Sequence, residues 1–179
     1  MAYSFHKYWS EVTTGSIQSY LTMRNNYNVP LWMSESGENS NSWFTDFVKL
    51  LDANKIGWSW WTIKKFEAIS PLASVTVAPQ FKILMNYWNN GGTKPSVDYS
   101  MAALRLQIEN FKINNCTPKL DVLDALFRRP FNNDLFPFAE NKIPGTINGV
   151  NFDYGNLGTA FYDVTPSNNG AGSYNNGWI

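Results

Sequence analysis

Three short apolar runs, each followed by a helical pattern, constrain the fold of this chain more than any other feature. The runs span residues 3–9, 29–35 and 56–62. Helical spacing of apolar side chains follows them over residues 15–26, from the polar cluster 40–42 and from Pro79. Alternation of this kind predicts βαβ units and a parallel sheet.

A parallel sheet of only three strands leaves its edges open, and such a sheet normally needs cover on both faces. A whole (β/α)₈ barrel takes about 250 residues, so three units amount to less than half of one. We therefore expect an α/β fold in which residues 1–93 are the C-terminal portion of a TIM barrel. The five N-terminal units are expected to lie outside this chain.

Only helical patterns remain after Pro95, so residues 94–130 predict a helical extension. In this extension Thr117-Pro118 is expected to open a helix that runs through Phe127. One face of the preceding helix is expected to carry Val97, Met101, Leu104, Ile108 and Phe111.

The last part of the chain is rich in Pro, Asn and Gly. Residues 131–142 predict a linker, and short β-like pieces separated by turn residues follow over 143–179. We expect these pieces to be the incomplete start of a β-sandwich module, because a sandwich needs seven or more strands.

Charge and hydropathy exclude several classes of partner. The 14 basic and 14 acidic residues cancel, and no basic stripe exists that would neutralise a phosphate backbone, so nucleic acid is not an expected partner. No apolar stretch approaches the roughly 20 residues needed to cross a bilayer, so a membrane is not expected either. No signal peptide is visible, and the single Cys116, which excludes an internal disulfide, is expected to be buried or inert.

The aromatic content is high, with eight Trp, nine Tyr and twelve Phe, many of them close to Asn, Gly and Ser. A pyranose ring presents C–H groups to an aromatic face while its hydroxyls need polar partners, so this mixture suits sugar binding. A Trp-rich core explains the same composition, and composition alone does not choose between the two.

Glu35 ends the second apolar run, at the C-terminal end of a predicted barrel strand, where barrel enzymes place catalytic groups. We predict it to be the catalytic nucleophile. The alternative for such an acid is a solvated or helix-starting residue. That alternative fits Glu38 better, because Glu38 precedes the Asn/Ser capping cluster and is favoured by the helix dipole. Glu38 remains a candidate substrate contact.

His6 and Tyr8 are two residues apart on a predicted strand, so their side chains point to the same face. A tyrosine hydroxyl there would donate to a neighbouring carboxylate, and the imidazole would hydrogen-bond a sugar hydroxyl. A single histidine is more often structural, and only its spacing from Tyr8 favours a role in the site.

The tryptophans of the third run cannot all face the same way on one strand. Either Trp58 and Trp60 fill the space between sheet and helices while Trp61 faces the cleft, or the reverse holds. Trp61 is nearer the C-terminal end of the strand and is the better candidate for a platform under a sugar ring. Lys64 in the following loop is a candidate substrate contact, and a solvated loop explains it equally well.

Three blocks of residues together form a recognisable pattern. They are Phe5-His6-Lys7-Tyr8, the eleven residues from Pro30 to Ser40, and Gly57-Trp58-Ser59-Trp60-Trp61. In order and spacing the blocks resemble strands six, seven and eight of family 5 glycoside hydrolases, the cellulase family. The resemblance implies that Glu35 is the nucleophile, that His6 and Tyr8 are the His-x-Tyr pair beside it, and that Trp61 floors the subsite of the cleaved sugar.

The resemblance also implies a retaining mechanism, in which one carboxylate attacks the anomeric carbon and another, roughly 5 Å away, protonates the leaving oxygen. In the family the second carboxylate follows an Asn on strand four. No Asn-Glu pair here lies at such a strand end, and Glu109-Asn110, which has the reverse order, lies inside a predicted helix. The chain alone is therefore expected to be inactive.

Cleavage of cellulose or a related β-glycan by a secreted, extracellular parent protein is the function that the resemblance implies. This chemistry needs no cofactor and no metal, and no His/Cys/Asp cluster in the sequence has the spacing of metal ligands.

Residues 143–147, 151–155 and 158–166 are similar to the opening of carbohydrate-binding modules of the family 6 type, which are β-sandwiches. This sequence departs from the family's pattern at two positions where glutamates would help hold a structural calcium. Asn148 and Val150 stand there instead, which leaves that calcium site without these ligands.

Two other classes of function remain open. A noncatalytic carbohydrate-binding protein would explain the aromatic content without Glu35. A purely structural α/β domain would have no sugar affinity. Loss of hydrolysis with retained binding after replacement of Glu35 separates the first from an enzyme.

Overall fold

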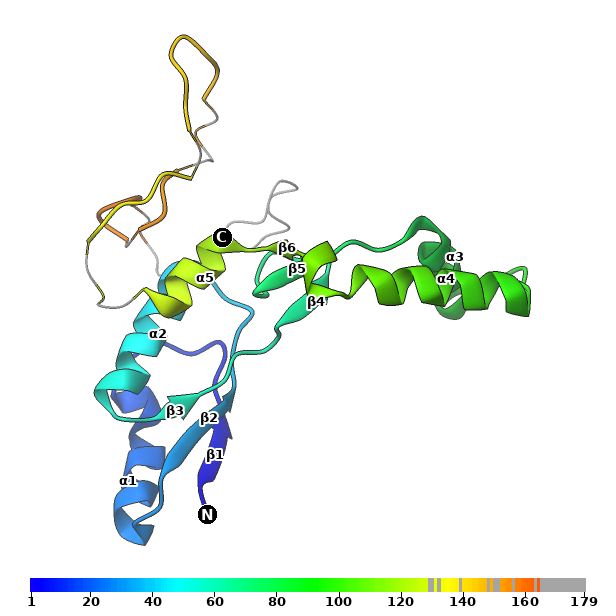
Figure 1. Cartoon of the computed structure of the whole chain (residues 1–179). Helices are drawn as coiled ribbons and strands as arrows, with labels where there is room; N and C mark the ends of the chain where they lie inside the picture. Colours follow the sequence, from blue (N-terminus) through cyan, green and yellow to red (C-terminus); the bar gives the residue numbers. More distant parts are fainter. Residues whose placement is uncertain are drawn as a thin grey trace. The chain divides into compact units, whose positions relative to one another are not determined.

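The computed structural model describes residues 1–128, 131, 133–138, 140–147, 149, 152–155, 157–162 and 164. Over these residues the chain is a mixed α/β protein with five α-helices and two three-stranded sheets, and neither sheet closes into a barrel (Figure 1). Contacts divide the chain into two compact units. The first unit comprises Met1–Trp61 and the chain from Leu120 onward, and the inserted unit comprises Thr62–Lys119.

The first unit contains the parallel sheet expected from the three apolar runs. Its strands are β1 (Tyr3–His6), β2 (Leu31–Glu35) and β3 (Gly57–Trp58), in the order β1-β2-β3. The strands are shorter than the runs that predicted them, and β3 has only two residues. Because the three strands pair in parallel, their carboxyl ends meet at one edge of the sheet.

One face of this sheet is covered and the other is open. Phe5 and Met33 are buried on the covered face, where Phe5 stacks on Tyr20 of α1 (Gln18–Tyr27) with ring centroids 4.1 Å apart. A single turn of 3₁₀ helix, η1 (Gly15–Ile17), precedes α1. On the other face Trp32 is 42% exposed. Because a parallel sheet is normally covered on both faces, the open face is unusual.

The helix α2 (Asn41–Ala53) supplies the densest part of the core. It begins where predicted, because the Ser40 hydroxyl accepts a hydrogen bond from the Trp43 N–H at 3.2 Å and so caps its first turn. Its buried apolar side chains follow helical spacing along one side and are Trp43, Phe44, Phe47, Val48 and Leu51.

The helix that packs on α2 is α5 (Leu120–Phe127), and the expectation that the helix from Pro79 completes the third β/α unit is wrong. The Thr45 hydroxyl donates to the Ala125 carbonyl at 3.0 Å, and the rings of Trp58 and Phe127 lie 5.8 Å apart. The inserted unit separates β3 from α5 along the chain, so the helical pattern nearest to β3 is not its structural partner.

The inserted unit contains a second sheet that the sequence did not reveal. β4 (Lys64–Phe66) pairs in parallel with β5 (Ala73–Val75), which pairs antiparallel with β6 (Thr117–Pro118). Thr117-Pro118 is thus a strand, and the prediction that it opens a helix is wrong. The strands are two or three residues long and partly polar, which leaves no alternating pattern to detect.

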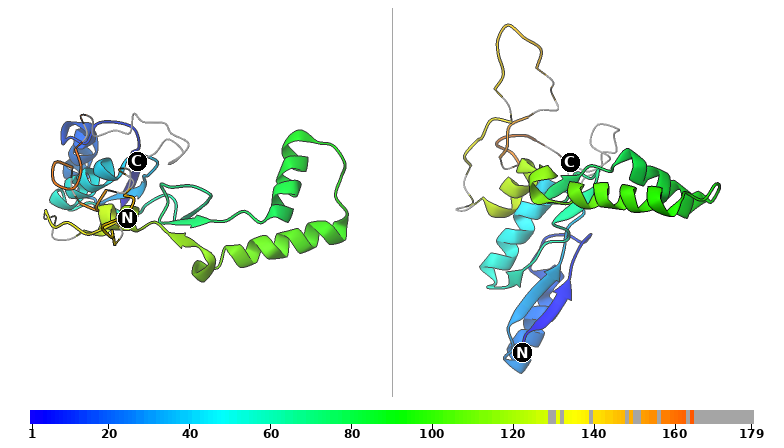
Figure 2. Two further views of the ribbon diagram at one scale, coloured as in Figure 1. Left: turned by 90° about the horizontal axis from the view of Figure 1, so that it is seen from above. Right: turned by 45° about the vertical axis from the view of Figure 1, so that its right-hand side comes forward.

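Between β5 and β6 the chain forms the helices α3 (Pro79–Asn90) and α4 (Val97–Asn110), followed by the 3₁₀ turn η2 (Ile113–Asn115) (Figure 2). The predicted boundary between residues 93 and 94 therefore falls inside one compact unit. The core between the helices is formed by Val77, Ala78, Phe81, Leu84 and Ala103.

The side of α4 that is buried differs from the expected apolar face. Ala103 and Gln107 are buried, and the Gln107 amide accepts from the Ala78 N–H at 2.9 Å and donates to the Thr76 carbonyl at 3.3 Å. A small residue and a satisfied amide allow this close packing. Of the expected face, Val97, Met101 and Ile108 remain exposed.

Beyond α5 the described residues form isolated bridges, between Phe136 and Tyr154 and between Leu157 and Phe161. The buried Arg128 holds the start of this segment, since its guanidinium pairs with Asp124 at 2.8 Å and donates to the Asp134 carbonyl. Asn148, Val150 and the end of the expected β module lie outside the described residues. None of the described helices is long and apolar enough to cross a membrane.

Candidate active site

Glu35 stands at the C-terminal end of β2, opposite the end of β1. Strand pairing matches Phe5 with Met33 and then His6 with Glu35, so Ser34 is passed over by a bulge. The Lys7 N–H donates to the Glu35 carbonyl at 3.2 Å, which continues the pairing past the strand end. A bulge of this kind redirects side chains at a strand end, and here it sets His6 beside Glu35.

Tyr8 and Glu35 are in direct contact. The Tyr8 hydroxyl donates to Glu35 Oε1 at 2.5 Å, a short distance for a bond to a carboxylate. The residues are 27 positions apart and come from neighbouring strand ends. The contact fixes the direction of the carboxylate, which is what a group that must attack a defined atom requires.

The environment of Tyr8 keeps its hydroxyl a donor. Burial, the hydrogen bond to Glu35 and the negative charges of Glu35 and Glu38 hold the pKa of the Tyr8 phenol well above its ordinary value. The phenol therefore stays protonated throughout the neutral range and keeps its bond to Glu35.

His6 flanks the other carboxylate oxygen. Its Nδ1 lies 4.0 Å from Glu35 Oε2, and the imidazole is more than half exposed while the Glu35 side chain is 32% exposed. At this distance the pair is not a hydrogen bond, and the exposed imidazole retains nitrogen atoms for a ligand. The structure thus places His6 and Tyr8, the two predicted partners, beside Glu35.

The burial of the tryptophans agrees with the first of the two arrangements, and the position of Trp61 in a cleft stays a prediction. Trp60 is buried against Phe44, with ring centroids 4.9 Å apart, and Trp58 packs edge-on against Trp60 at 5.9 Å. Trp61 is 54% exposed. Among the three tryptophans of this run, Trp61 is therefore the most accessible to a ligand.

Backbone contacts tie Trp61 to the strand end that carries Glu35. The Trp61 N–H donates to the Ser36 carbonyl at 2.7 Å. A Cβ placed on Gly37, which has φ +151°, would lie 2.0 Å from the Trp61 carbonyl oxygen. Only glycine permits this approach, so the residue two after Glu35 sets the position of Trp61.

The two remaining predicted contacts lie in different surroundings. Glu38 adopts a left-handed conformation with φ 54° and is close enough to Tyr8 to raise its pKa. Lys64 belongs to β4 in the inserted unit, and its ammonium donates to the Phe111 carbonyl at 2.5 Å. Its proposed contact with a substrate stays a prediction.

Lys7 is a buried lysine beside the site, and sequence reasoning missed its burial. It lies between His6 and Tyr8 but points into the core, where it is 6% exposed and its ammonium donates to the Ser10 and Glu11 carbonyls at 3.3 and 2.9 Å. Burial lowers its pKa. A lysine at an inward position of a strand was the available signal, since buried lysines are rare unless partnered.

Taken together, an oriented and partly exposed carboxylate lies beside an imidazole and near the backbone of an exposed indole. Such a carboxylate can act as a nucleophile or as a general base toward a bound ligand. Over the residues that the structure describes, no group of three or more His, Cys, Asp or Glu side chains is arranged to hold a metal ion.

Comparisons with models of known protein families, with curated proteins and with solved structures give no match for this chain.

Proposed function

We propose that this chain is part of a retaining glycoside hydrolase of the cellulase family, in which Glu35 is the nucleophile that attacks the anomeric carbon of a β-glycan. The first unit would be the C-terminal portion of a (β/α)₈ barrel, with β1, β2 and β3 as its last three strands. The open sheet face at Trp32 is consistent with this origin, because the inner face of a barrel is covered by its other strands.

The observation that carries the proposal is the 2.5 Å bond from Tyr8 to Glu35 at the carboxyl ends of two parallel strands. It joins residues from two separate blocks of the sequence, which the resemblance places side by side. Catalytic groups of barrel enzymes occupy this edge of the sheet, whereas a purely structural carboxylate has no need to stay accessible there.

Within this proposal Glu35 forms a bond to the anomeric carbon while the glycosidic bond breaks and the leaving oxygen takes a proton from a second carboxylic acid. That acid is proposed to lie in the missing N-terminal barrel half. Trp61 would support the sugar ring, and His6 would hydrogen-bond one of its hydroxyls. The parent protein is proposed to act outside the cell on polysaccharide.

A fluorosugar with a good leaving group tests the nucleophile without needing the acid. A 2-deoxy-2-fluoro-β-cellobioside of dinitrophenol expels its phenolate unaided, and the covalent glycosyl-enzyme then accumulates. We expect intact mass spectrometry to show one added sugar per chain, and peptide mapping to place it on Glu35.

Glu11→Gln is the control, since it removes an exposed carboxylate of the same unit that has no role in the site, and it should leave labelling unchanged. Glu35→Gln should abolish labelling. An unlabelled wild-type chain, or a label that persists in Glu35→Gln, contradicts the assignment.

A noncatalytic sugar-binding protein is the second candidate, favoured by the exposed indoles Trp9 and Trp61, which are 63% and 54% exposed. Affinity electrophoresis through soluble β-glucan separates the candidates when combined with the labelling experiment. Retardation that is lost in Trp61→Ala, together with no labelling of the wild-type chain, would favour binding alone.

A further inference from the structure

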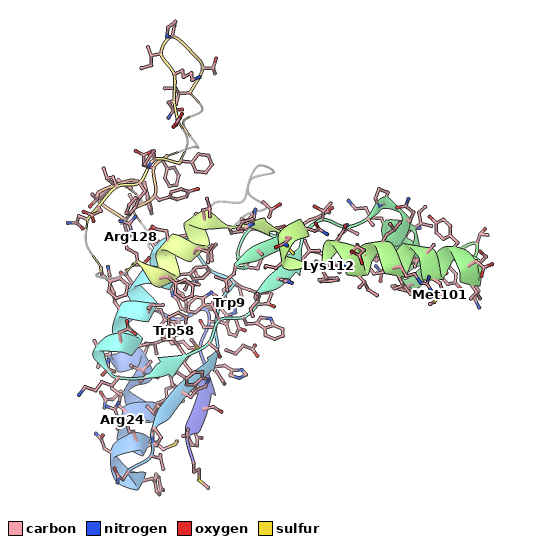
Figure 3. All side chains as sticks on the ribbon, viewed as in Figure 1. Trp9, Arg24, Trp58, Met101, Lys112 and Arg128 are labelled. Carbon is pink, nitrogen blue, oxygen red and sulfur yellow. The ribbon has the colours of Figure 1, made fainter. Side chains whose placement is uncertain are left out.

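The segment that follows β1 carries Tyr8 outside any regular structure. Residues 7–14 belong to neither a helix nor a strand, and Trp9, which Figure 3 labels, comes directly after Tyr8 in this segment. The Tyr8 hydroxyl nevertheless binds Glu35 at 2.5 Å. An irregular segment has many conformations, so a bond of fixed direction requires other contacts that hold the segment in one of them.

The buried ammonium of Lys7 closes this segment on itself. It donates to the Glu11 carbonyl at 2.9 Å, to the Ser10 carbonyl at 3.3 Å and also to the Ser10 hydroxyl. A lysine ammonium has three N–H donors, and three acceptors are available to it here. Since these bonds join residue 7 to residues 10 and 11, Tyr8 and Trp9 lie within a closed turn.

Two further contacts attach this turn to the rest of the first unit. The Lys7 N–H donates to the Glu35 carbonyl at 3.2 Å, which fixes the start of the turn on β2. The Trp43 indole N–H donates to the Ser10 carbonyl at 3.0 Å, which fixes its end on α2. The Lys7 ammonium also lies 5.9 Å and 5.6 Å from the ring centroids of Trp43 and Phe47, within the range of cation–π contacts.

A lysine is a costly residue for packing alone. Lys7 is 6% exposed, and its burial lowers the pKa of the ammonium because the charged form loses its hydration. A methionine would fill a similar volume without this cost. What the lysine adds over an apolar residue is its set of bonds to the turn that contains Tyr8.

We propose that Lys7 is a positioning residue, whose ammonium closes residues 7–11 into a fixed turn and so holds the Tyr8 hydroxyl on the Glu35 carboxylate. Lys7 touches no substrate in this proposal and acts only through Tyr8. The role in presenting a nucleophile rests on the proposed function, since a carboxylate of fixed direction matters for attack on one defined atom.

Lys7→Met in the full 179-residue chain tests the proposal, because it removes the ammonium and keeps an unbranched side chain. Hydrogen exchange followed by mass spectrometry measures the turn at neutral pH without reference to any activity. We expect the amides of residues 7–11 to exchange at least about tenfold faster, because the turn opens more often.

Fluorosugar labelling of Glu35 measures the consequence for the site. We expect the rate constant of labelling at saturating fluorosugar to fall about tenfold in Lys7→Met, because the carboxylate loses its direction. The fluorosugar concentration that gives half of the maximal rate should stay unchanged, because no contact with the sugar is removed.

A second variant and a double variant show whether Lys7 acts through Tyr8. Tyr8→Phe should itself slow labelling, and adding Lys7→Met to it should cause no further loss. Ser10→Ala removes one acceptor of the ammonium from an exposed side chain, so it should remain folded. We expect it to slow labelling about two- to threefold, and it decides the question if Lys7→Met does not fold.

Val48→Ala is the control for a loss of stability alone. It truncates a fully buried side chain of α2 and removes none of the bonds to the turn. With all variants folded by circular dichroism, its labelling rate and its exchange over residues 7–11 should match those of the wild type.

Three results would overturn the proposal. The first is exchange over residues 7–11 that Lys7→Met leaves unchanged. The second is a loss of labelling in Lys7→Met that adds in full to the loss in Tyr8→Phe. The third is an equal loss in Val48→Ala. A wild-type chain that is not labelled contradicts the proposed function instead. Exchange then decides the anchoring of the turn by itself, with faster exchange in Lys7→Met supporting it.

Discussion

The first unit and the inserted unit place their aromatic and apolar residues very differently. In the first unit Trp43, Phe44 and Phe47 are almost fully buried behind a parallel sheet whose ends carry Glu35 and Tyr8. In the inserted unit the buried residues are fewer and smaller, and part of the apolar surface of α4 faces solvent. The difference shows that the polar site at Glu35 lies in the unit with the larger buried core.

The larger core of the first unit suits the role proposed for Glu35. A carboxylate that must attack one atom has to be held within a fraction of an ångström, and only a closely packed core beneath the strand ends provides this. The inserted unit contains neither Glu35 nor its neighbours His6 and Tyr8, and its short strands and two helices enclose a smaller core.

Truncation of the two cores should produce the largest effect and tests the comparison directly. Phe44→Ala removes a fully buried ring and should lower the free energy of unfolding by about 4 kcal/mol. Leu84→Ala, the matched truncation in the inserted unit, should cost about 3 kcal/mol. Urea denaturation monitored by hydrogen exchange measures the free energy of unfolding of each unit separately. An equal or larger loss for Leu84→Ala would show that the cores do not differ.

Gly37→Ala should cost about 2–3 kcal/mol, because its Cβ would collide with the Trp61 carbonyl. The same change should reduce fluorosugar labelling of Glu35, since the two strand ends must move apart. Gly15→Ala is the control in the same unit. Its Cβ meets only the Thr13 hydroxyl at 3.7 Å, so near-neutral stability and normal labelling are expected there.

Tyr8→Phe should cost about 1 kcal/mol near neutral pH by removing the bond to Glu35. The folded state raises the pKa of Tyr8, so its contribution is fully present below the unfolded pKa of about 10 and is lost as the pH rises through the higher folded pKa. The stability difference between wild type and Tyr8→Phe should therefore shrink above about pH 10. Thermal melts at pH 8 and pH 11 measure it, and a constant difference would contradict the assigned environment.

The exposed ion pair of the inserted unit should give the smallest effect. Lys82 lies 2.8 Å from Glu67 and lowers its pKa, but both side chains are about half exposed. Glu67→Gln should therefore cost less than about 1 kcal/mol. Because the folded pKa is depressed, the contribution is present above the unfolded pKa of about 4.3 and is lost as the pH falls through the folded value. Thermal melts measure the stability difference between wild type and Glu67→Gln, which high salt should make smaller. A larger loss of stability that does not depend on salt would contradict a surface ion pair.

Local patterns in the sequence were enough to predict the three parallel strands and the start of α2 at Ser40, whereas the meeting of Tyr8 with Glu35 was implied by the resemblance of the sequence blocks to a known family. These features depend on side-chain alternation, capping and the rule that parallel strands end at a common edge, all of which act over a few residues. The same patterns did not reveal β4, β5 and β6, whose two or three residues carry no periodic signal.

Only the tertiary structure decided which helix completes the third unit, which tryptophans are buried and which side of α4 is covered. The helix from Pro79 and the helix ending at Phe127 have equally good patterns, and only the packing of α5 on α2 distinguishes them. Likewise Trp60 is buried and Trp61 exposed because Gly37 draws the Trp61 backbone against the end of β2. Such choices depend on contacts between residues far apart in the chain, and a local pattern contains no information about them.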